Sequence, residues 1–431
     1  MSLENHKSAK KEHTTTERSL FFLCNGFPIV SETFVSEQIL NALKNYHYVS
    51  VHVDYINSKD NYLMENDLFL NENIPRIFVN HRPPEKYAKR LVSAFLLALR
   101  HSKKISFFKS INPFIFGFKS LNIRPFYSYS SFLGKPNPTL IHAQFGANGV
   151  KAINAKIANV VNCPIVTSFH GYDAHVEPNN IGKFRKYYFN LFKYGDKFIV
   201  NGNFLKEQLL ELGCPENKII KIPIGVNLET FKPSAKRTDI DAGTIKFITV
   251  GRLINWKNQE FGIRLLRLIR DEGINASYTL IGEGPEEKFL RDLAIQLNLV
   301  NHVHFLGSMP NKEIADILPK CHIFLMTSYK DETGRMETQG IVSAEAQACG
   351  LPVITLGFGG TADTIMHGVT GYNVSSSSPE DAIKYVRNLI NPLKYNELSI
   401  NARNFILENY DIEVTNRSLI KIYENLITNY R

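Results

Sequence analysis

The chain has 431 residues, of which 44% are hydrophobic and 21% are charged. This balance is that of an ordinary globular protein, and the length predicts two domains that each bury a core of their own. The five cysteines are scattered without a Cys-x-x-Cys spacing, which argues against a zinc site and favours reduced thiols in a cytoplasmic protein over a disulfide framework.

The net charge of +9 is carried by one stretch, residues 82–124, which contains ten lysines and arginines and a single acid, Glu85. Aromatic residues are interleaved with these charges. Such a segment can lie on an anionic membrane surface, where each basic residue contributes about 1 kcal/mol. A solvated helix face above core aromatics explains the pattern equally well, whereas nucleic-acid binding is disfavoured because no known binding motif accompanies the charge. The apolar run at residues 91–99 is too short to cross a bilayer, which needs roughly 20 apolar residues.

After a polar lead-in at residues 1–18, which we expect to be disordered, the first half alternates apolar strands with helices. Ser31 is predicted to be the N-cap of the first helix. The predicted strands are residues 20–24, 48–55, 139–145, 164–170, 197–200 and 219–223. Helices are predicted at 31–43 and 148–160, and the basic stretch at 82–124 is predicted to be a helical region.

A polar stretch at residues 234–243 predicts a linker, and the alternation resumes after it. Strands are predicted at 245–250, 276–281, 303–306, 323–326 and 353–355, and helices at 259–272, 286–297, 312–318, 343–349 and 412–431. This order predicts a doubly wound parallel sheet in each half, with ligands beyond the carboxyl ends of the strands. We therefore expect Rossmann-like domains at 19–233 and 244–411, followed by a C-terminal helix at 412–431.

Two of the loops that follow predicted strands have residues suited to binding a nucleotide. Arg252 and Lys257 follow the strand at 245–250, and two cations beside a helix N-terminus can neutralise a diphosphate leaving group without a metal. A pair of ordinary surface cations is the alternative. A Gly-Glu-Gly-Pro turn at 282–285 follows the next strand and lets a base or ribose approach, although such turns also serve simply to start a helix.

The strongest pattern is in a third loop. Glu337 precedes a predicted helix and Glu345 lies inside it, and carboxylates accept hydrogen bonds from sugar hydroxyls. The backbone amides of Gly340, Ile341 and Val342 lie where a helix N-terminus would hold a phosphate group. The two acids are also compatible with an acid and base pair, as in glycosidases, or with the acids that are common at helix starts.

A fourth loop follows the strand at 164–170 and contains His170. This histidine can face a cleft and help to hold a reacting sugar. A lone histidine at a strand end is more often a structural group, so the residue alone does not decide between the two interpretations.

Together and in this order, the four loops resemble the retaining glycosyltransferases of family 4, which have the GT-B fold of two Rossmann-like domains facing a cleft. The resemblance rests on the Gly251-Arg252…Lys257 loop, the Gly-x-Gly-Pro turn, and a Glu-x7-Glu pattern followed by Ala-x-Ala-x-Gly-x-Pro-Val. Phe27-Pro28 with Ser31-Glu32-Thr33-Phe34, and the run His142-Ala143-Gln144-Phe145-Gly146, are similar to the subgroup that builds bacterial exopolysaccharide, capsule or lipopolysaccharide.

The resemblance implies a role for each candidate residue. Arg252 and Lys257 would bind the donor diphosphate, and Glu345 would hold the ribose. Glu337 and His170 would be the catalytic residues and would contact the donor sugar at the reacting centre. The remaining donor-binding residues would be Gly282, Glu283, Leu306, Gly340, Ile341 and Val342.

The resemblance also implies the reaction. A nucleotide diphosphate sugar, with UDP more common than GDP, would bind the C-terminal domain, and a glycan or polyprenyl-linked acceptor would bind the N-terminal domain. Neither a metal nor a cofactor is expected. The Asp239-Ile240-Asp241 motif is similar to the metal site of another glycosyltransferase fold, but it follows no apolar strand, so we attribute it to chance.

We expect the enzyme to work in the cytoplasm or at the inner face of the cell membrane, with residues 82–124 as the membrane contact. The C-terminal helix would cross back to the N-terminal domain. Two alternatives stay open on these residues. One is a nucleotide-sugar epimerase on the same fold, and the other is an inactive membrane-associated binding protein.

Overall fold

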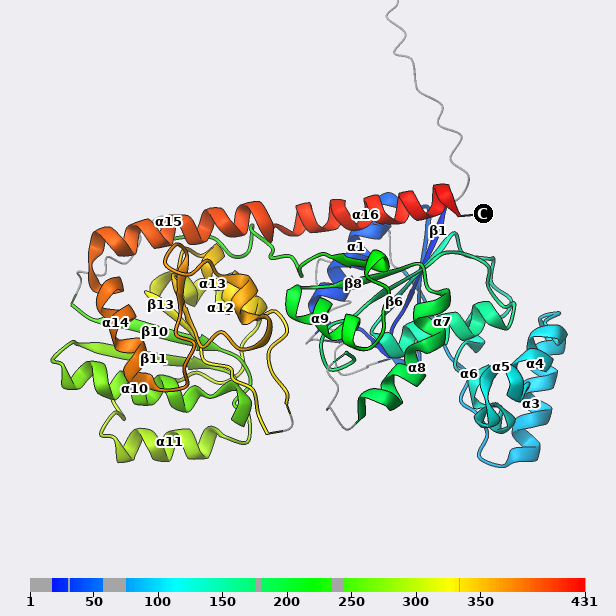
Figure 1. Cartoon of the computed structure of the whole chain (residues 1–431), viewed down its shortest axis with the longest axis horizontal. Helices are drawn as coiled ribbons and strands as arrows, with labels where there is room; N and C mark the ends of the chain where they lie inside the picture. Colours follow the sequence, from blue (N-terminus) through cyan, green and yellow to red (C-terminus); the bar gives the residue numbers. More distant parts are fainter. Residues whose placement is uncertain are drawn as a thin grey trace, which may run out of the picture. The chain divides into compact units, whose positions relative to one another are not determined.

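The computed structural model describes residues 18–29, 32–56, 75–174, 180–234, 243–332 and 334–430 (Figure 1). The lead-in up to residue 17, the Ser31 N-cap and most of the predicted linker, including Asp239-Ile240-Asp241, lie outside the described residues. Within the described part, one compact unit comprises the residues up to His142 with Asn154–Pro164 and Tyr430, and the other comprises Ala143–Ile153 and Ile165–Asn429. The domain boundaries at 19–233 and 244–411 stay a prediction.

The first sheet has seven strands in the order β5-β3-β1-β6-β7-β8-β9. The strands are β1 (Ser19–Leu23), β3 (Tyr48–Val53), β5 (Arg76–Val79), β6 (Leu140–Gln144), β7 (Ile165–Ser168), β8 (Lys197–Val200) and β9 (Ile219–Lys221). The pairs of β1 with β3 and of β7 with β8 are parallel, as the strand and helix alternation predicts. A separate two-stranded sheet joins β2 (Gly26–Phe27) to β4 (Tyr55–Ile56).

Helices connect these strands because their apolar residues recur on one face. In α1 (Thr33–Asn45), for example, Val35, Ile39 and Ala42 are buried, at the spacing of one helical stripe. The other long helices of this region are α7 (Gly146–Ile157), α8 (Ile181–Tyr194) and α9 (Asn203–Glu211).

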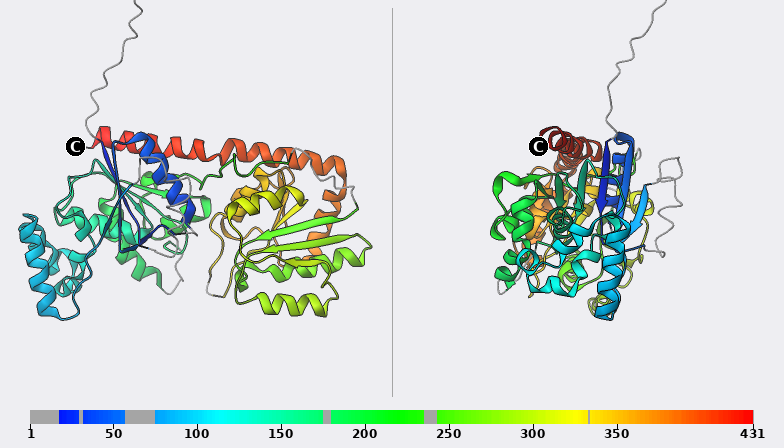
Figure 2. Two further views of the ribbon diagram at one scale, coloured as in Figure 1. Left: turned by 180° about the vertical axis from the view of Figure 1, so that it is seen from behind. Right: turned by 90° about the vertical axis from the view of Figure 1, so that its right-hand side faces the viewer.

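The basic stretch forms a cluster of short helices, which Figures 1 and 2 show in cyan. It consists of α3 (Tyr87–Arg100), α4 (Lys104–Ser110), α5 (Pro113–Phe116), the 3-10 turn η3 (Phe118–Asn122), α6 (Arg124–Tyr127) and the 3-10 turn η4 (Ser130–Phe132). Pro113 and Gly117, whose φ of 71° is left-handed, divide what the sequence suggests is one helical region. The buried guanidinium of Arg90 holds the cluster together, because it donates to the carbonyl oxygens of Pro84, Glu85 and Asn122.

The second sheet has six strands in the order β12-β11-β10-β13-β14-β15, and each neighbouring pair is parallel. The strands are β10 (Ile245–Val250), β11 (Ala276–Ile281), β12 (Val303–Phe305), β13 (Ile323–Met326), β14 (Val353–Thr355) and β15 (Gly371–Asn373). The helices are α10 (Gln259–Asp271), α11 (Glu287–Gln296), α12 (Asn311–Ile317), α13 (Ile341–Ala348), α14 (Pro379–Ile390), α15 (Pro392–Asn409) and α16 (Ile412–Asn429), with 3-10 turns η7 (Asn255–Lys257) and η9 (Gly359–Thr364) among others.

Two apolar cores lie on opposite faces of this second sheet. Side chains of α10, α11 and α14 form one core, with Phe247 from β10. Side chains of α12 and α13 contribute to the other, with Ile248 from the same strand. The doubly wound arrangement predicted for this half is therefore confirmed (Figure 1). Among the described residues, no helix combines the length and the apolar character that a membrane span requires.

Candidate active site

The loops after β10 and β11 lie against each other at the carboxyl ends of these strands. The amide of Leu253 donates to the carbonyl oxygen of Glu283 at 2.9 Å. A Cβ atom at Gly282 would lie 2.0 Å from the carbonyl oxygen of Gly251, and one at Gly284 would lie 2.1 Å from that of Leu253. The Gly-x-Gly spacing is therefore required for two backbones to approach. The predicted contact of Gly282 with a base stays a prediction.

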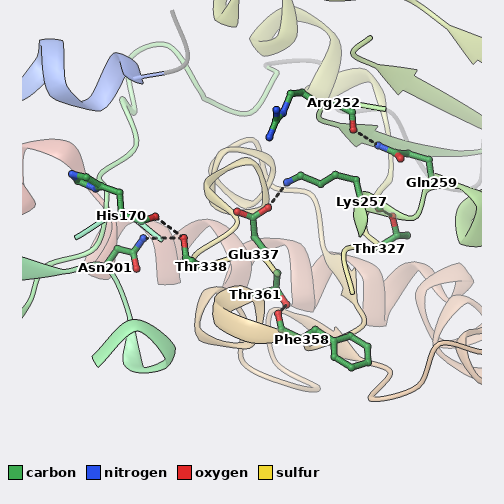
Figure 3. Close-up of polar contacts among 10 residues, drawn as sticks. All are labelled: His170, Asn201, Arg252, Lys257, Gln259, Thr327, Glu337, Thr338, Phe358 and Thr361. Carbon is green, nitrogen blue, oxygen red and sulfur yellow. Dashed lines mark hydrogen bonds and ion pairs between the residues drawn. The ribbon is translucent and has the colours of Figure 1, made fainter. Parts of the chain in front are cut away.

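The two predicted cations lie in the loop between β10 and α10. Arg252 is exposed, and its carbonyl oxygen accepts a hydrogen bond from the Gln259 side chain at 2.9 Å. Lys257 ends η7, and its ammonium group lies 4.6 Å from the centre of the Trp256 ring. In Figure 3 the charged ends of Arg252 and Lys257 both point toward the side on which Glu337 lies.

Lys257 and Glu337 form an ion pair although they are 80 residues apart in the sequence. The Lys257 ammonium contacts Oε2 of Glu337, and the two side chains are only 16% and 18% exposed. The hydroxyl of Thr327, just after β13, donates to the carbonyl oxygen of Lys257 at 2.7 Å and fixes this loop (Figure 3). The structure thus brings together Lys257, which the sequence predicts for donor binding, and Glu337, which it predicts as a catalytic residue.

A glycine pair, Gly359-Gly360, packs against the backbone of the loop that contains Glu337. The amide of Gly360 donates to the carbonyl oxygen of Glu337 at 2.8 Å. A Cβ atom would lie 2.2 Å from that oxygen at Gly359 and 1.8 Å from the carbonyl oxygen of Thr338 at Gly360. The position of the Glu337 loop therefore depends on these glycines. Sequence reasoning did not assign them to the site, and the Gly-Gly pair itself was the available signal.

Helix α13 begins directly after this loop. Gly340 precedes its first residue with a left-handed φ of 72°, and the amides of Ile341 and Val342 lie in the first turn, where a helix leaves its N–H groups without helical partners. Glu345 is buried in the same helix, and this burial raises the pKa of its carboxyl group to about 8. Glu345 is therefore protonated at neutral pH in the absence of a ligand.

Glu283 and Leu306 lie at the neighbouring strand ends. Oε1 of the exposed Glu283 accepts a hydrogen bond from the Ser308 amide at 3.3 Å. Leu306, which follows β12, is 40% exposed. Both predicted residues therefore belong to one rim of loops after β11 and β12.

His170 follows β7, and both its ring and its backbone carbonyl group form hydrogen bonds. Its Nε2 lies 2.8 Å from Oε1 of Gln144, and its carbonyl oxygen accepts a hydrogen bond from the Thr338 hydroxyl at 2.9 Å. Thr338 is next to Glu337, so the loop of His170 contacts the loop of the second predicted catalytic residue (Figure 3). Burial lowers the pKa of His170 to about 3, and the ring is neutral at physiological pH.

Asp173 organises the His170 loop and was not predicted as a site residue. Its carboxylate accepts hydrogen bonds from the amides of Gly146 at 2.8 Å, Gly171 at 2.9 Å and His170 at 3.0 Å. The side chain is 4% exposed. A carboxylate three residues after the histidine was the available signal, because aspartate caps backbone amides in tight turns.

The part of the chain that the structure describes contains no group of three or more His, Cys, Asp or Glu side chains arranged to hold a metal ion. The site instead consists of cations, buried carboxyl groups and helix amides at the carboxyl ends of parallel strands. This arrangement is suited to a phosphorylated ligand that also carries hydroxyl groups.

The protein families that the chain matches define its class of enzyme. Residues 231–405 match the family described as "Glycosyl transferases group 1", and residues 75–230 match "Glycosyltransferase Family 4". The two matches are consecutive. Together they span residues 75–405, which is more than half of the chain. The chain therefore belongs to the family 4 (group 1) glycosyltransferases, and its fold is GT-B.

Two similar proteins are named for the biosynthesis of bacterial polysaccharides. The chain is 28% identical over 289 residues to the "Putative colanic acid biosynthesis glycosyltransferase WcaL" of Escherichia coli (strain K12). The matched region covers 66% of this chain and 70% of that protein. It is 29% identical to the "Amylovoran biosynthesis glycosyltransferase AmsK" of Erwinia amylovora over 54% of this chain and 56% of that protein.

Solved structures share the fold. The crystal structure of HepE from Anabaena in complex with UDP superposes with a TM-score of 0.70 at 19% identity, over 95% of this chain and all of that one. A sucrose-phosphate synthase from Thermosynechococcus elongatus gives a TM-score of 0.64 at 18% identity, over 95% of this chain and 99% of that one. At these identities the likeness concerns the fold alone.

Proposed function

We propose that the chain is a retaining, metal-independent glycosyltransferase whose donor is a nucleotide diphosphate sugar, with UDP favoured over GDP. The Lys257–Glu337 pair carries this proposal, because it puts a cation and a carboxylate from two strand-end loops at one partly buried point. A transferase needs a cation for the diphosphate that leaves and an acceptor of hydrogen bonds for the hydroxyls of the sugar that moves.

Donor binding would rearrange this pair. Without a ligand, Glu337 balances the charge of Lys257. The donor diphosphate would replace Glu337 as the partner of Lys257, with Arg252 as a second cation, and Glu337 would turn to the sugar hydroxyls. The amides of Ile341 and Val342 would add hydrogen bonds to the phosphate oxygens.

The proposed transfer step uses these groups. The bond between the anomeric carbon and the diphosphate oxygen breaks while the acceptor hydroxyl bonds to that carbon from the same face. The acceptor proton passes to the released diphosphate oxygen, so the protein supplies no separate base. Lys257 and the α13 amides stabilise the charge that grows on the leaving group. His170, which is neutral, supplies a hydrogen bond near the reacting carbon.

The names of the relatives favour a bacterial surface polysaccharide as the product, because they refer to the biosynthesis of colanic acid and of amylovoran. HepE structures contain UDP and UDP-glucose, which favours UDP. We infer a glycan or polyprenyl-linked acceptor. A lipid-linked acceptor would place the reaction at the inner face of the cell membrane, with residues 82–124 as a peripheral contact.

Calorimetric titration with UDP, GDP and ADP, in the presence of EDTA, tests the donor site. We expect UDP to bind and Lys257→Ala to weaken its affinity at least about tenfold, because the diphosphate loses its main cation. Lys312→Ala, which removes an exposed lysine of α12, serves as the matched control and should leave UDP binding unchanged.

Two outcomes would contradict the proposal. If a folded sample binds none of the three nucleotides, the pair is not a donor site, and the inactive binding protein becomes the better explanation. If UDP-sugars are isomerised in the absence of an acceptor, the epimerase alternative is correct.

A further inference from the structure

Helix α3 has a second apolar face that the protein leaves uncovered. Ala94 and Ala98 are buried on one side of the helix, whereas Val92 and Leu96 are each 57% exposed on another. A surface helix normally presents polar residues to water. The exposed face of α3 therefore differs from that of an ordinary surface helix.

The helices that follow α3 in the cluster also carry exposed apolar side chains. Phe95 of α3 lies 6.4 Å from Phe108 of α4 between ring centres, and Phe108 is 59% exposed. Further along, Phe114 of α5 is 98% exposed and Phe118 of η3 is 84% exposed. Two nearly fully exposed phenylalanines in one short segment are costly in water and indicate a surface that is covered in use.

Two adjoining hollows lie on α3 and differ in character. One, of about 350 Å³, is lined by His81, Arg82, Arg100 and Tyr127 among others. The other, of about 430 Å³, is lined mainly by Ala88, Val92 and the stem of Lys89. Both include Ser93 and Leu96, so a cationic hollow opens beside an apolar one. An amphipathic molecule with an anionic head and an apolar tail fits this pair.

The charges around this face are unbalanced. Residues 82–124 hold ten basic residues and one acid, and among their described side chains no lysine or arginine forms an ion pair. Two of these basic side chains donate hydrogen bonds to the backbone: Arg90 to three carbonyl oxygens, and Lys103 to the carbonyl oxygen of Val160 at 3.3 Å. The local field is strong enough that Arg100, His81 and Lys135 add to the effect of burial in lowering the pKa of His101. An anionic partner would relieve this repulsion.

We propose that the exposed basic and apolar side chains of this helical cluster together bind the surface of an anionic phospholipid membrane, and we call Arg82, Val92, Leu96, Arg100, Phe114 and Phe118 the docking face. The Arg82–Arg100 hollow takes a lipid phosphate, and Phe114 and Phe118 insert among the acyl chains. A second copy of the chain is a poorer occupant, because it would bring a like charge against this one. The inference rests on the proposed function for its purpose, which is to bring the enzyme to a lipid-linked acceptor.

Co-sedimentation with vesicles tests the docking face. The vesicles contain phosphatidylcholine with about one third phosphatidylglycerol, and pure phosphatidylcholine serves as the comparison. We expect the full chain to bind the anionic vesicles and to be released by salt. Phe114→Ser with Phe118→Ser, and separately Arg82→Ser with Arg100→Ser, should each weaken binding at least about tenfold.

Two control pairs match these changes in chemistry. Leu393→Ser with Ile400→Ser removes exposed apolar side chains of α15, and Arg417→Ser with Lys421→Ser removes two exposed charges of α16. Both controls should bind vesicles like the unaltered chain.

A Phe114→Trp variant gives a direct readout. Its fluorescence should shift to the blue and be quenched by brominated acyl chains, over the background of Trp256. UDP calorimetry on every variant should give unchanged affinity, so failure of the docking face is distinguishable from failure of the donor site.

Three outcomes would overturn the proposal. The first is an unaltered chain that ignores anionic vesicles at low salt. The second is an equal loss of binding in the control pairs. The third is a dimer in sedimentation velocity that the Phe114 and Phe118 changes convert to a monomer, because the face would then join two copies of the chain.

Discussion

The buried carboxyl group of Glu345 differs strongly in its pKa from an ordinary glutamate. Burial in α13 raises its pKa to about 8 and also places it close enough to Cys349 to add to the effect of burial on that thiol. A protonated Glu345 can donate a hydrogen bond to a ribose oxygen, and an ionised one can accept two from ribose hydroxyls. The residue is therefore suited to its predicted contact in either state.

The raised pKa predicts a pH dependence of stability. Between pH 4.5, the ordinary value for glutamate, and pH 8, the unfolded chain has Glu345 ionised while the folded chain keeps it protonated. Folding takes up a proton in this window, so the stability of the protein falls as the pH rises through it. Glu345→Gln lacks this loss, and its advantage in the free energy of unfolding should grow to on the order of 5 kcal/mol by pH 8 and then level off.

Urea unfolding of both proteins at several pH values measures this difference. Glu313→Gln, at an exposed position of α12, is the control and should follow the unaltered chain. A difference between Glu345→Gln and the unaltered chain that stays constant from pH 4.5 to pH 8 would show that Glu345 is ionised throughout.

Sequence reasoning could name individual candidate residues but not the contacts between them. Lys257, Glu337 and Glu345 each stand in a recognisable pattern after a predicted strand, but the pairing of Lys257 with Glu337 depends on which strands are neighbours in the sheet. The strand order places β13 directly beside β10, and the chain order does not reveal this. Asp173 was missed because its carboxylate accepts its hydrogen bonds from backbone amides, so its spacing from His170 was its one trace in the sequence.

At the scale of elements, Asp173 joins two loops that carry the site. It holds the turn before α7 through the Gly146 amide and the turn after β7 through the amides of His170 and Gly171. Asp173→Ala would leave three amides without their partner and should lower the free energy of unfolding by about 2–4 kcal/mol. It should also reduce glycosyl transfer more than UDP binding, since His170 loses its support while the Lys257 loop does not.

The measurements are urea unfolding, UDP calorimetry and the turnover number for transfer. Glu207→Ala, an exposed acid of α9, is the control for removal of a carboxylate. Equal losses of UDP affinity and of turnover in Asp173→Ala would mean that the residue acts through general stability and not through the position of His170.

Strands whose residues are buried could be predicted from apolar runs in the sequence. Strands β1 and β6 are almost entirely buried, and their apolar runs were predicted within one or two residues. Strand β5 was missed because its residues are exposed or half-buried, and an edge strand of four residues has no apolar run to identify it. The basic stretch was predicted as helical, but the packing of its helices against one another depends on Arg90, which donates to the carbonyl oxygen of Asn122, 32 residues away in the sequence.

At the scale of the whole molecule, the connection between β9 and β10 meets the junction between α15 and α16. The amide of Val226 donates to the carbonyl oxygen of Tyr410 at 2.7 Å, and the amide of Ile412 donates back to that of Val226 at 3.1 Å. Two residues earlier, Ile224 exchanges hydrogen bonds of 2.9 and 3.0 Å with the side chain of Gln339. The segment that joins the two sheets is thereby tied to the loop of Glu337.

Gly225 lies at the centre of this junction, and we expect it to tolerate no side chain. A Cβ atom there would lie 2.6 Å from the Cα atom of Ile412 and 2.5 Å from the Thr415 hydroxyl oxygen. Because one of these atoms is backbone, Gly225→Ala requires the α16 start to move, and we expect a loss of about 1–3 kcal/mol in the free energy of unfolding. Gly182→Ala is the matched control: no atom lies within 4 Å of its added Cβ, and in the first turn of α8 it should be neutral or stabilising by up to about 1 kcal/mol. Urea unfolding measures the stability of both variants. If Gly225→Ala is as stable as Gly182→Ala, the contact between Gly225 and the start of α16 is not a rigid part of the fold.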